Sequence, residues 1–182
     1  LWEVGDVVLS RFAVRQVLIW MLQFEGTNMF FLLSLVLGVV AGLRAMTPAA
    51  ALSWPAFLGW LDLSATPFAF LGHPIAVAIF TLVALGELVT DQLPQTPSRK
   101  APVQFGTRLV MGALAGGVLG LPSDMWIGGA IAGVIGAVIG TLGGYEARKR
   151  LVASNGGNDR PIALLEDAVA VILALLVVWL AA

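Results

Sequence analysis

The sequence predicts an all-α polytopic membrane protein of about five transmembrane helices, two of which form a glycine-rich helical hairpin. Composition is the first reason: 59% of the 182 residues are hydrophobic and 12% are charged, against roughly 45–50% and 25% in a soluble domain. Second, the apolar residues form blocks that approach the roughly 20 residues a helix needs to cross a bilayer. Third, glycine recurs at four-residue spacing in these blocks, a pattern that allows membrane helices to pack closely.

Composition also limits the function. The chain has no cysteine, and His73 is its only histidine, so disulfides, thiolate metal sites and histidine clusters within one chain are excluded. No G-x-S-x-G motif is present for a serine nucleophile, and a formal net charge of −1 gives no basic surface for nucleic acid. We therefore expect a protein that is not an enzyme, holds no cofactor or metal, binds no nucleic acid and has the lipid bilayer as a partner.

Residues 1–28 differ from the rest of the chain. The stretch 7–24 is apolar, but two arginines and a glutamine interrupt it and scatter around a helical wheel. We interpret 1–28 either as an interfacial helix that lies on the membrane or as an N-terminal extension upstream of a natural start at Met29. Residues 29–182 are predicted to be a single helical transmembrane domain.

The first span is predicted over 29–52. Arg44 lies roughly 22 Å along this helix at about 1.5 Å per residue, and Thr47 and Pro48 follow it. Threonine can satisfy backbone groups that a proline frees in a membrane helix, so a local break is allowed here. The segment 53–73, which contains two tryptophans, suits the membrane–water interface and is interpreted as an interfacial loop or re-entrant segment.

Four further spans complete the predicted bundle. The second covers 74–91 and is followed by a polar loop whose three prolines block a helix. The third, 106–121, and the fourth, 125–145, are joined by a tight turn. After a second polar loop the fifth span covers 162–180, with a proline at a permitted helix start.

Lysines and arginines indicate the orientation of the spans. They occur in the loops 92–108 and 146–160, whereas 53–73 and 122–124 contain none. If the spans alternate, both basic loops lie on the side that the positive-inside rule assigns to the cytoplasm. We therefore expect a bacterial inner (cytoplasmic) membrane protein with a cytoplasmic N-terminus and a periplasmic C-terminus.

Glycine recurs every fourth residue in the first, third and fourth spans. Residues at i and i+4 share a helical face, and a glycine stripe lets two membrane helices approach closely, although each helical glycine costs about 1 kcal/mol against alanine. The pattern predicts packing of the third span against the fourth. A homo-oligomer, a partner membrane subunit and a pore lined by glycine backbone remain open. The expected packing positions are Gly38, Gly42, Gly112, Gly116, Gly120, Gly128, Gly136, Gly140 and Gly144.

Two carboxylates lie at the end of the second span. Glu87 and Asp91 repel each other and oppose the helix dipole, and burial in lipid adds about 2.5–3.5 kcal/mol per charge. These costs require water or cationic partners. In the predicted topology Arg108, Glu166 and Asp167 lie at the same depth. The group has three interpretations: paired interfacial charges that fix helix depth, a polar vestibule that binds a cation or exchanges protons, or a two-carboxylate catalytic site.

Arg44 is a separate case because an arginine inside a membrane marks a functional site by default. We expect it on the outer half of the bundle, where Asp62 and Asp124 are its candidate partners. A structural ion pair and a contact to an anionic substrate both remain open.

Four segments, in this order, resemble a known family: GLRAMTP at 42–48, GELVTDQLP at 86–94, RLVMGALAGG in the glycine-rich hairpin and ALLEDAVA at 163–170. They resemble the uncharacterised bacterial membrane-protein family catalogued as domain of unknown function 4126, from about Met29 to the C-terminus. The resemblance implies a multi-spanning fold and supplies no activity, substrate or catalytic residue. This chain has Gln92 where the family usually has a lysine.

The leading functional hypothesis is a transporter or channel-like permease for a small solute or ion. Its polar pathway would run from Arg44 on the outer half to Glu87 and Asp91 on the inner half. The alternatives are a non-transporting structural or accessory membrane subunit and a membrane enzyme that acts on lipid head groups. The candidate pathway residues are Arg44, Thr47, Glu87, Asp91, Arg108, Glu166 and Asp167.

Overall fold

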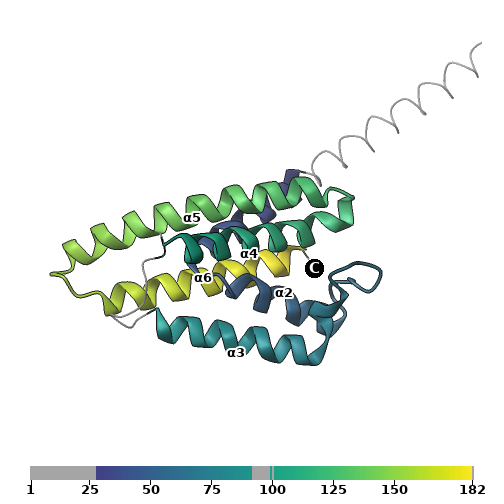
Figure 1. The fold of residues 1–182 in the computed structure, drawn as a ribbon, viewed down its shortest axis with the longest axis horizontal. Helices are drawn as coiled ribbons and strands as arrows, with labels where there is room; N and C mark the ends of the chain where they lie inside the picture. The colour runs from purple at the N-terminus through teal and green to yellow at the C-terminus, as the bar shows by residue number, and fades with distance from the viewer. Residues whose placement is uncertain (1–27, 92–98, 100, 182) are drawn as a thin grey trace, which may run out of the picture.

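A computed structural model describes residues 28–91, 99 and 101–181, and all regular secondary structure in these ranges is helical. The prediction of an all-α fold is therefore confirmed, while the alternatives for residues 1–28 lie almost wholly outside the described residues. Figure 1 shows an elongated helical bundle. Its helices are Asn28–Leu43, α2 (Thr47–Leu58), α3 (Pro74–Thr90), α4 (Pro102–Gly120), α5 (Trp126–Ser154) and α6 (Arg160–Ala181), with short 3-10 turns at Ala69–Gly72 and Leu121–Ser123.

The helices are consistent with embedding in a membrane. Among the described residues α4, α5 and α6 are long and apolar enough to cross a bilayer, whereas Asn28–Leu43 and α3 are shorter apolar helices. Large apolar side chains face outward; on α5, Ile127, Ile131 and Ile135 follow one another at four-residue spacing and are 57%, 57% and 49% exposed. An outward apolar surface of this kind is what lipid, rather than water, accommodates.

The predicted first span over 29–52 is wrong, because the chain reverses direction at Arg44. The helix Asn28–Leu43 runs parallel to α5, since Gly38 lies against Gly133 and Gly42 lies against Thr141. The following helix, α2, runs the opposite way, so its far end is close to Gly72, just before α3 begins. Residues 28–58 thus form a helical hairpin with its turn over residues 44–46.

Proline explains why the helix stops where it does. Pro48 occupies the first turn of α2, where its fixed φ and missing N–H are tolerated. In a continuous helix its ring would clash with the carbonyl of residue 44, four positions earlier. Residues 45 and 46 adopt a bend, and α2 restarts at Thr47.

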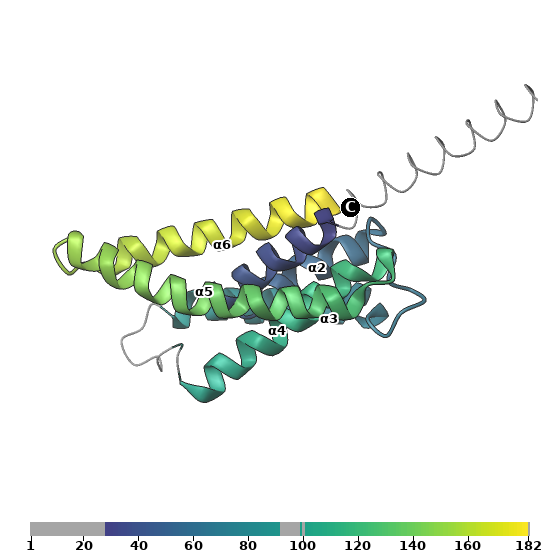
Figure 2. The same cartoon turned by 90° about the horizontal axis from the view of Figure 1, so that it is seen from above.

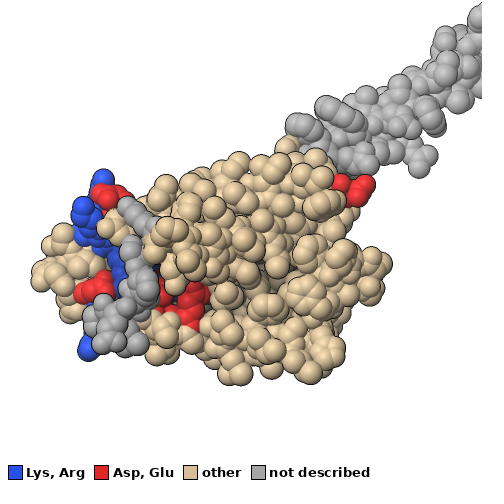
Figure 3. Space-filling view, viewed as in Figure 1, with Lys and Arg blue, Asp and Glu red and all other residues tan. Residues whose placement is uncertain are grey.

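The bundle has two chemically different ends. The end of Asn28–Leu43, the start of α2, the end of α3 and the starts of α4 and α6 meet at one of them, here called the polar end (Figures 1 and 2). The lysine and arginine side chains in view gather there in Figure 3, together with most of the acidic ones. The opposite end, here called the tryptophan end, carries Trp60, Trp126 and Trp179, and both Asn28 and Ala181 lie toward it.

Glycines allow the central helices to touch. Gly112 of α4 faces Gly133 of α5, and a Cβ added to Gly112 would lie 2.6 Å from the Gly133 carbonyl oxygen. Gly136 and Gly140 of α5 meet the backbone of Asn28–Leu43 on the other side. Since a real Cβ does not approach a backbone oxygen so closely, both interfaces of α5 depend on the absence of side chains. The other glycines whose added Cβ would meet a neighbouring helix or turn are Gly38, Gly42, Gly116, Gly120, Gly128, Gly129 and Gly144.

Candidate functional site

Charged residues converge around the turn of the helical hairpin. Four arginines and four carboxylates form two neighbouring networks of ion pairs at the polar end, and we call the two together the polar cluster. It contains all the predicted pathway residues except Thr47, and adds two arginines. Its members are Arg44, Glu87, Asp91, Arg99, Arg108, Arg148, Glu166 and Asp167.

Arg44 lies at the centre of the polar cluster and is fully buried. Its Nε donates to Asp167 Oδ1 at 2.5 Å, and its Nη1 forms an ion pair with Asp91. The predicted pairing with Asp62 or Asp124 is wrong. Because the hairpin reverses at residue 44, Arg44 lies at the same end as Asp91 and not on the opposite half of the bundle.

Glu87 caps the second helix of the hairpin. Its two carboxylate oxygens accept the backbone N–H groups of Ala45 and Met46 at 2.7 and 2.8 Å. The N–H groups at a helix start have no partner within the helix, and the dipole there favours a negative charge. Glu87 lies at the C-terminal end of α3, where the dipole of α3 disfavours an acid, but its charge stabilises the N-terminal end of α2.

Arg108 caps the first helix of the hairpin in the complementary way. Its Nη1 donates to the carbonyl oxygens of Gly42 and Leu43, both at 2.7 Å, and the residue is 1% exposed. These carbonyls belong to the last turn of Asn28–Leu43, where they lack helical partners. Arg108 also lies 3.6 Å from Asp91 and 3.9 Å from Glu87. Both open ends of the broken helix are thus satisfied by charges from α3 and α4.

A second group of ion pairs continues the polar cluster toward the exposed loop. Arg99 holds Glu166 through two hydrogen bonds of 2.5 and 2.9 Å, and Arg148 reaches the same carboxylate at 3.3 Å. Arg148 also binds Asp159 through hydrogen bonds of 2.8 and 2.7 Å, and these bonds hold the pKa of Asp159 below its ordinary value. Sequence reasoning placed Arg99 and Arg148 only in basic loops, since spacing alone does not show which carboxylate each one faces.

Arg148 also pairs with Asp159, so the four arginines of the polar cluster contact five carboxylates in all, giving 4 − 5 = −1. Buried charges are tolerated when they are paired and hydrogen-bonded, whereas removal of one partner leaves an uncompensated charge. Among the described residues no three acidic or histidine side chains are arranged to hold a metal ion. The arrangement can fix the turn of the hairpin, and it closes the polar end of the space behind it.

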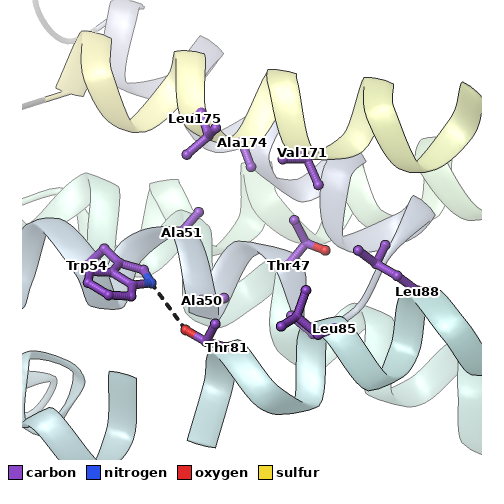
Figure 4. Close-up of a pocket in the computed structure, with 11 residues that line it drawn as sticks. Thr47, Ala50, Ala51, Trp54, Thr81, Leu85, Leu88, Val171, Ala174 and Leu175 are labelled. Carbon is purple, nitrogen blue, oxygen red and sulfur yellow. Dashed lines mark hydrogen bonds between the residues drawn. The ribbon is translucent and has the colours of Figure 1, made fainter. Parts of the chain in front are cut away.

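That space is a cavity of about 160 Å³ between α2, α3 and α6, here called the inner cavity (Figure 4). It lies directly beyond the Arg44 ion pairs. Leu88 precedes Asp91 by three residues and Val171 follows Asp167 by four, which are one-turn spacings at the end of α3 and on α6, and Thr47 begins α2 directly after the turn that holds Arg44. The lining residues are Thr47, Ala50, Ala51, Trp54, Thr81, Ala84, Leu85, Leu88, Val171, Ala174 and Leu175.

A second cavity of about 430 Å³, the outer cavity, lies between α2 and α3 toward the tryptophan end. The two cavities share Trp54 and Thr81. Trp54 Nε1 donates to Thr81 Oγ1 at 3.1 Å, which is the dashed line in Figure 4. The outer cavity, the Trp54–Thr81 bond, the inner cavity and the polar cluster therefore follow one another along α2 and α3.

Comparison with known proteins gives one match. Residues 31–181 match the family model described as Domain of unknown function (DUF4126). No curated protein and no solved structure matches the chain. The matched range includes the whole polar cluster, both cavities and nearly all of the described helices. Since the match covers well over half of the 182 residues, the resemblance seen in the sequence is confirmed, and the chain belongs to the DUF4126 family.

Proposed function

We propose that this protein is a small-solute permease of the cytoplasmic membrane, with its path between α2 and α3. The helical hairpin of residues 28–58, which the proposal treats as a re-entrant hairpin, is the observation that carries it. Irregular backbone at membrane depth is tolerated only where protein buries it or where it lines a cavity. Transporters use the ends of broken helices in this way to build their substrate sites.

The length of α2 supports a turn inside the membrane. Its 12 residues extend about 18 Å at roughly 1.5 Å per residue, which is less than the hydrocarbon thickness of about 30 Å. A hairpin that enters from the tryptophan end turns at the depth at which α3 ends, because Glu87 bonds to its turn. The outer and inner cavities follow α2 to that turn, and the polar cluster forms the closed gate of the path. The predicted pathway from an outer Arg44 to an inner Glu87 is replaced by this route.

Charge supports an orientation. All lysines and arginines among the described residues lie at the polar end, which the positive-inside rule places in the cytoplasm. With this orientation Asn28 and Ala181 both face the outer compartment, because the hairpin returns to the side from which it enters. The five crossings predicted after Met29 would put the two ends of the domain on opposite sides of the membrane. The proposed arrangement puts them on the same side instead.

A flux assay with a matched pair of variants tests the proposal. Ala50 lines the inner cavity, whereas Ala168 is exposed on α6 outside both cavities. Purified protein in liposomes is tested with glycerol, urea, acetamide, K⁺ and Cl⁻. We expect at least one probe to cross faster than in protein-free liposomes, and Ala50→Leu, but not Ala168→Leu, to lower that rate at least tenfold. Rates equal to those of protein-free liposomes for every probe, or no effect of Ala50→Leu, would contradict the proposal.

A second candidate function is a non-transporting structural or accessory membrane subunit, alone or as a homo-oligomer. The observation that favours it is that each carboxylate of the polar cluster already contacts an arginine. Purification from native membranes in mild detergent separates the two candidates. A stoichiometric partner together with absent flux would favour the subunit.

A further inference from the structure

We propose that the inner cavity binds a small neutral molecule that has an apolar body and one hydrogen-bonding group, and that this group bonds to Thr47. The inference deepens the proposed permease by naming a class of substrate, and it rests on that proposal for its transport role. The binding itself can be measured without any flux.

The size and lining of the inner cavity indicate the apolar body. Its volume is about 160 Å³, and an apolar cavity of about 150 Å³ accommodates a molecule the size of benzene. Nine of the eleven lining residues are alanine, leucine, valine or tryptophan. The lining carries no ionisable side chain, so an ion would lose its hydration without gaining a partner.

Thr47 indicates the single polar group. Its side chain is 6% exposed and forms part of the wall of the inner cavity in Figure 4. Its Oγ1 is itself covered, so a bound molecule bonds to it after the Thr47 side chain rotates to another staggered rotamer. Its Oγ1 has no hydrogen-bond partner among the residues that the structure describes. A buried hydroxyl without a partner is unfavourable, and nearly all buried polar groups in proteins are hydrogen-bonded. A ligand hydroxyl, carbonyl or amide at this position would complete the missing bond.

The second threonine of the lining is already occupied. Thr81 Oγ1 accepts the indole N–H of Trp54, whose side chain is also part of the wall of the outer cavity. This bond lies where the two cavities meet. Thr47 is therefore the polar group that a bound molecule meets beyond Trp54.

Fluorine NMR of the full chain in lipid nanodiscs tests the inference, with 4-fluorophenol and fluorobenzene as probes. The two rings match, and only 4-fluorophenol carries a hydroxyl. We expect saturable binding of 4-fluorophenol to the wild type. Thr47→Val, which keeps the shape of the side chain, should weaken that binding about fivefold, the factor for one net hydrogen bond of about 1 kcal/mol, and leave fluorobenzene within twofold. Ala50→Leu should abolish the binding of both probes.

The control is Thr107→Val, because Thr107 lies on α4 outside both cavities and bonds only to its own helix at Val103. This variant should bind both probes as the wild type does. Non-saturable partitioning of 4-fluorophenol, or equal affinities of Thr47→Val and wild type, would overturn the inference. An acyl chain of the nanodisc lipid in the cavity would give the first of these results. Saturable, Thr47-dependent binding without flux in liposomes would uphold the inference and remove the permease.

Discussion

Substitution of Glu87 gives the clearest test of how the hairpin is held. Glu87→Ala removes the acceptor of two backbone N–H groups, those of Ala45 and Met46. Hydrogen bonds to a charged group contribute about 1.5–3 kcal/mol each, so the loss of both should lower the free energy of unfolding by about 3–6 kcal/mol. Glu87→Gln keeps one oxygen acceptor without the charge, and about half of that loss is expected.

The assay is reversible unfolding in bicelles, with Glu146→Ala as the control. Glu146 forms an exposed pair with Arg150 one turn away on α5, and such pairs contribute about 0.2–0.5 kcal/mol. The reasoning requires that Glu87→Ala be far more destabilising than Glu146→Ala, with Glu87→Gln between them. Equal values for Glu87→Ala and Glu146→Ala, or a loss under about 1 kcal/mol for Glu87→Ala, would show that the carboxylate does not cap α2.

Three further predictions concern packing and charge. In bicelle unfolding, Gly116→Val should lower the free energy of unfolding by about 2 kcal/mol or more, because its Cβ would overlap the Gly129 carbonyl oxygen across the α4–α5 interface. The control is Gly143→Val, whose Cβ meets nothing within 4 Å and which should cost under about 1 kcal/mol. Arg44→Lys should lower the free energy of unfolding by about 3–5 kcal/mol, nearly as much as Arg44→Gln, because an ammonium does not reproduce the fork geometry of a guanidinium. Equal stability of Arg44→Lys and wild type would contradict this. The lowered pKa of Asp159 predicts that its pair with Arg148 stabilises the fold slightly, by under about 1 kcal/mol because the pair is half-exposed. This stabilisation is complete above the ordinary pKa of 3.8 and is lost as the pH falls through the lower pKa of the folded state. Arg148→Gln should remove that acid dependence from unfolding curves.

The four later helices could be predicted from the sequence because their signals are local. Hydropathy and proline position give 74–91, 106–121 and 162–180, and the structure has Pro74–Thr90, Pro102–Gly120 and Arg160–Ala181 there. The predicted span 125–145 ends too early, because α5 (Trp126–Ser154) continues nine residues into the predicted polar loop 146–160. The charges at their polar ends also follow from local position. Since consecutive helices alternate in direction, the end of α3 and the starts of α4 and α6 necessarily meet at one end of the bundle.

The reversal at Arg44 could not be predicted, because the stretch 29–52 has the length and hydropathy of one crossing. Pro48 permits a break, but a proline in a membrane helix is also compatible with a simple kink. What decides between the two is the capping of both helix ends by Glu87 and Arg108, which lie 41 and 66 residues away from the groups they bind. The position of Arg44, and hence its true partners Asp91 and Asp167, follows from that long-range contact.

Single-cysteine labelling from one side of the membrane tests the re-entrant hairpin most directly. The chain has no native cysteine, so Met29→Cys, Trp60→Cys and Arg150→Cys each place a single thiol at a known position. The hairpin predicts that a membrane-impermeant maleimide reaches Met29→Cys and Trp60→Cys from the same side and Arg150→Cys from the opposite side. Labelling of Met29→Cys from the side of Arg150→Cys would mean that 29–52 crosses the membrane once, and would contradict the hairpin and the path built on it.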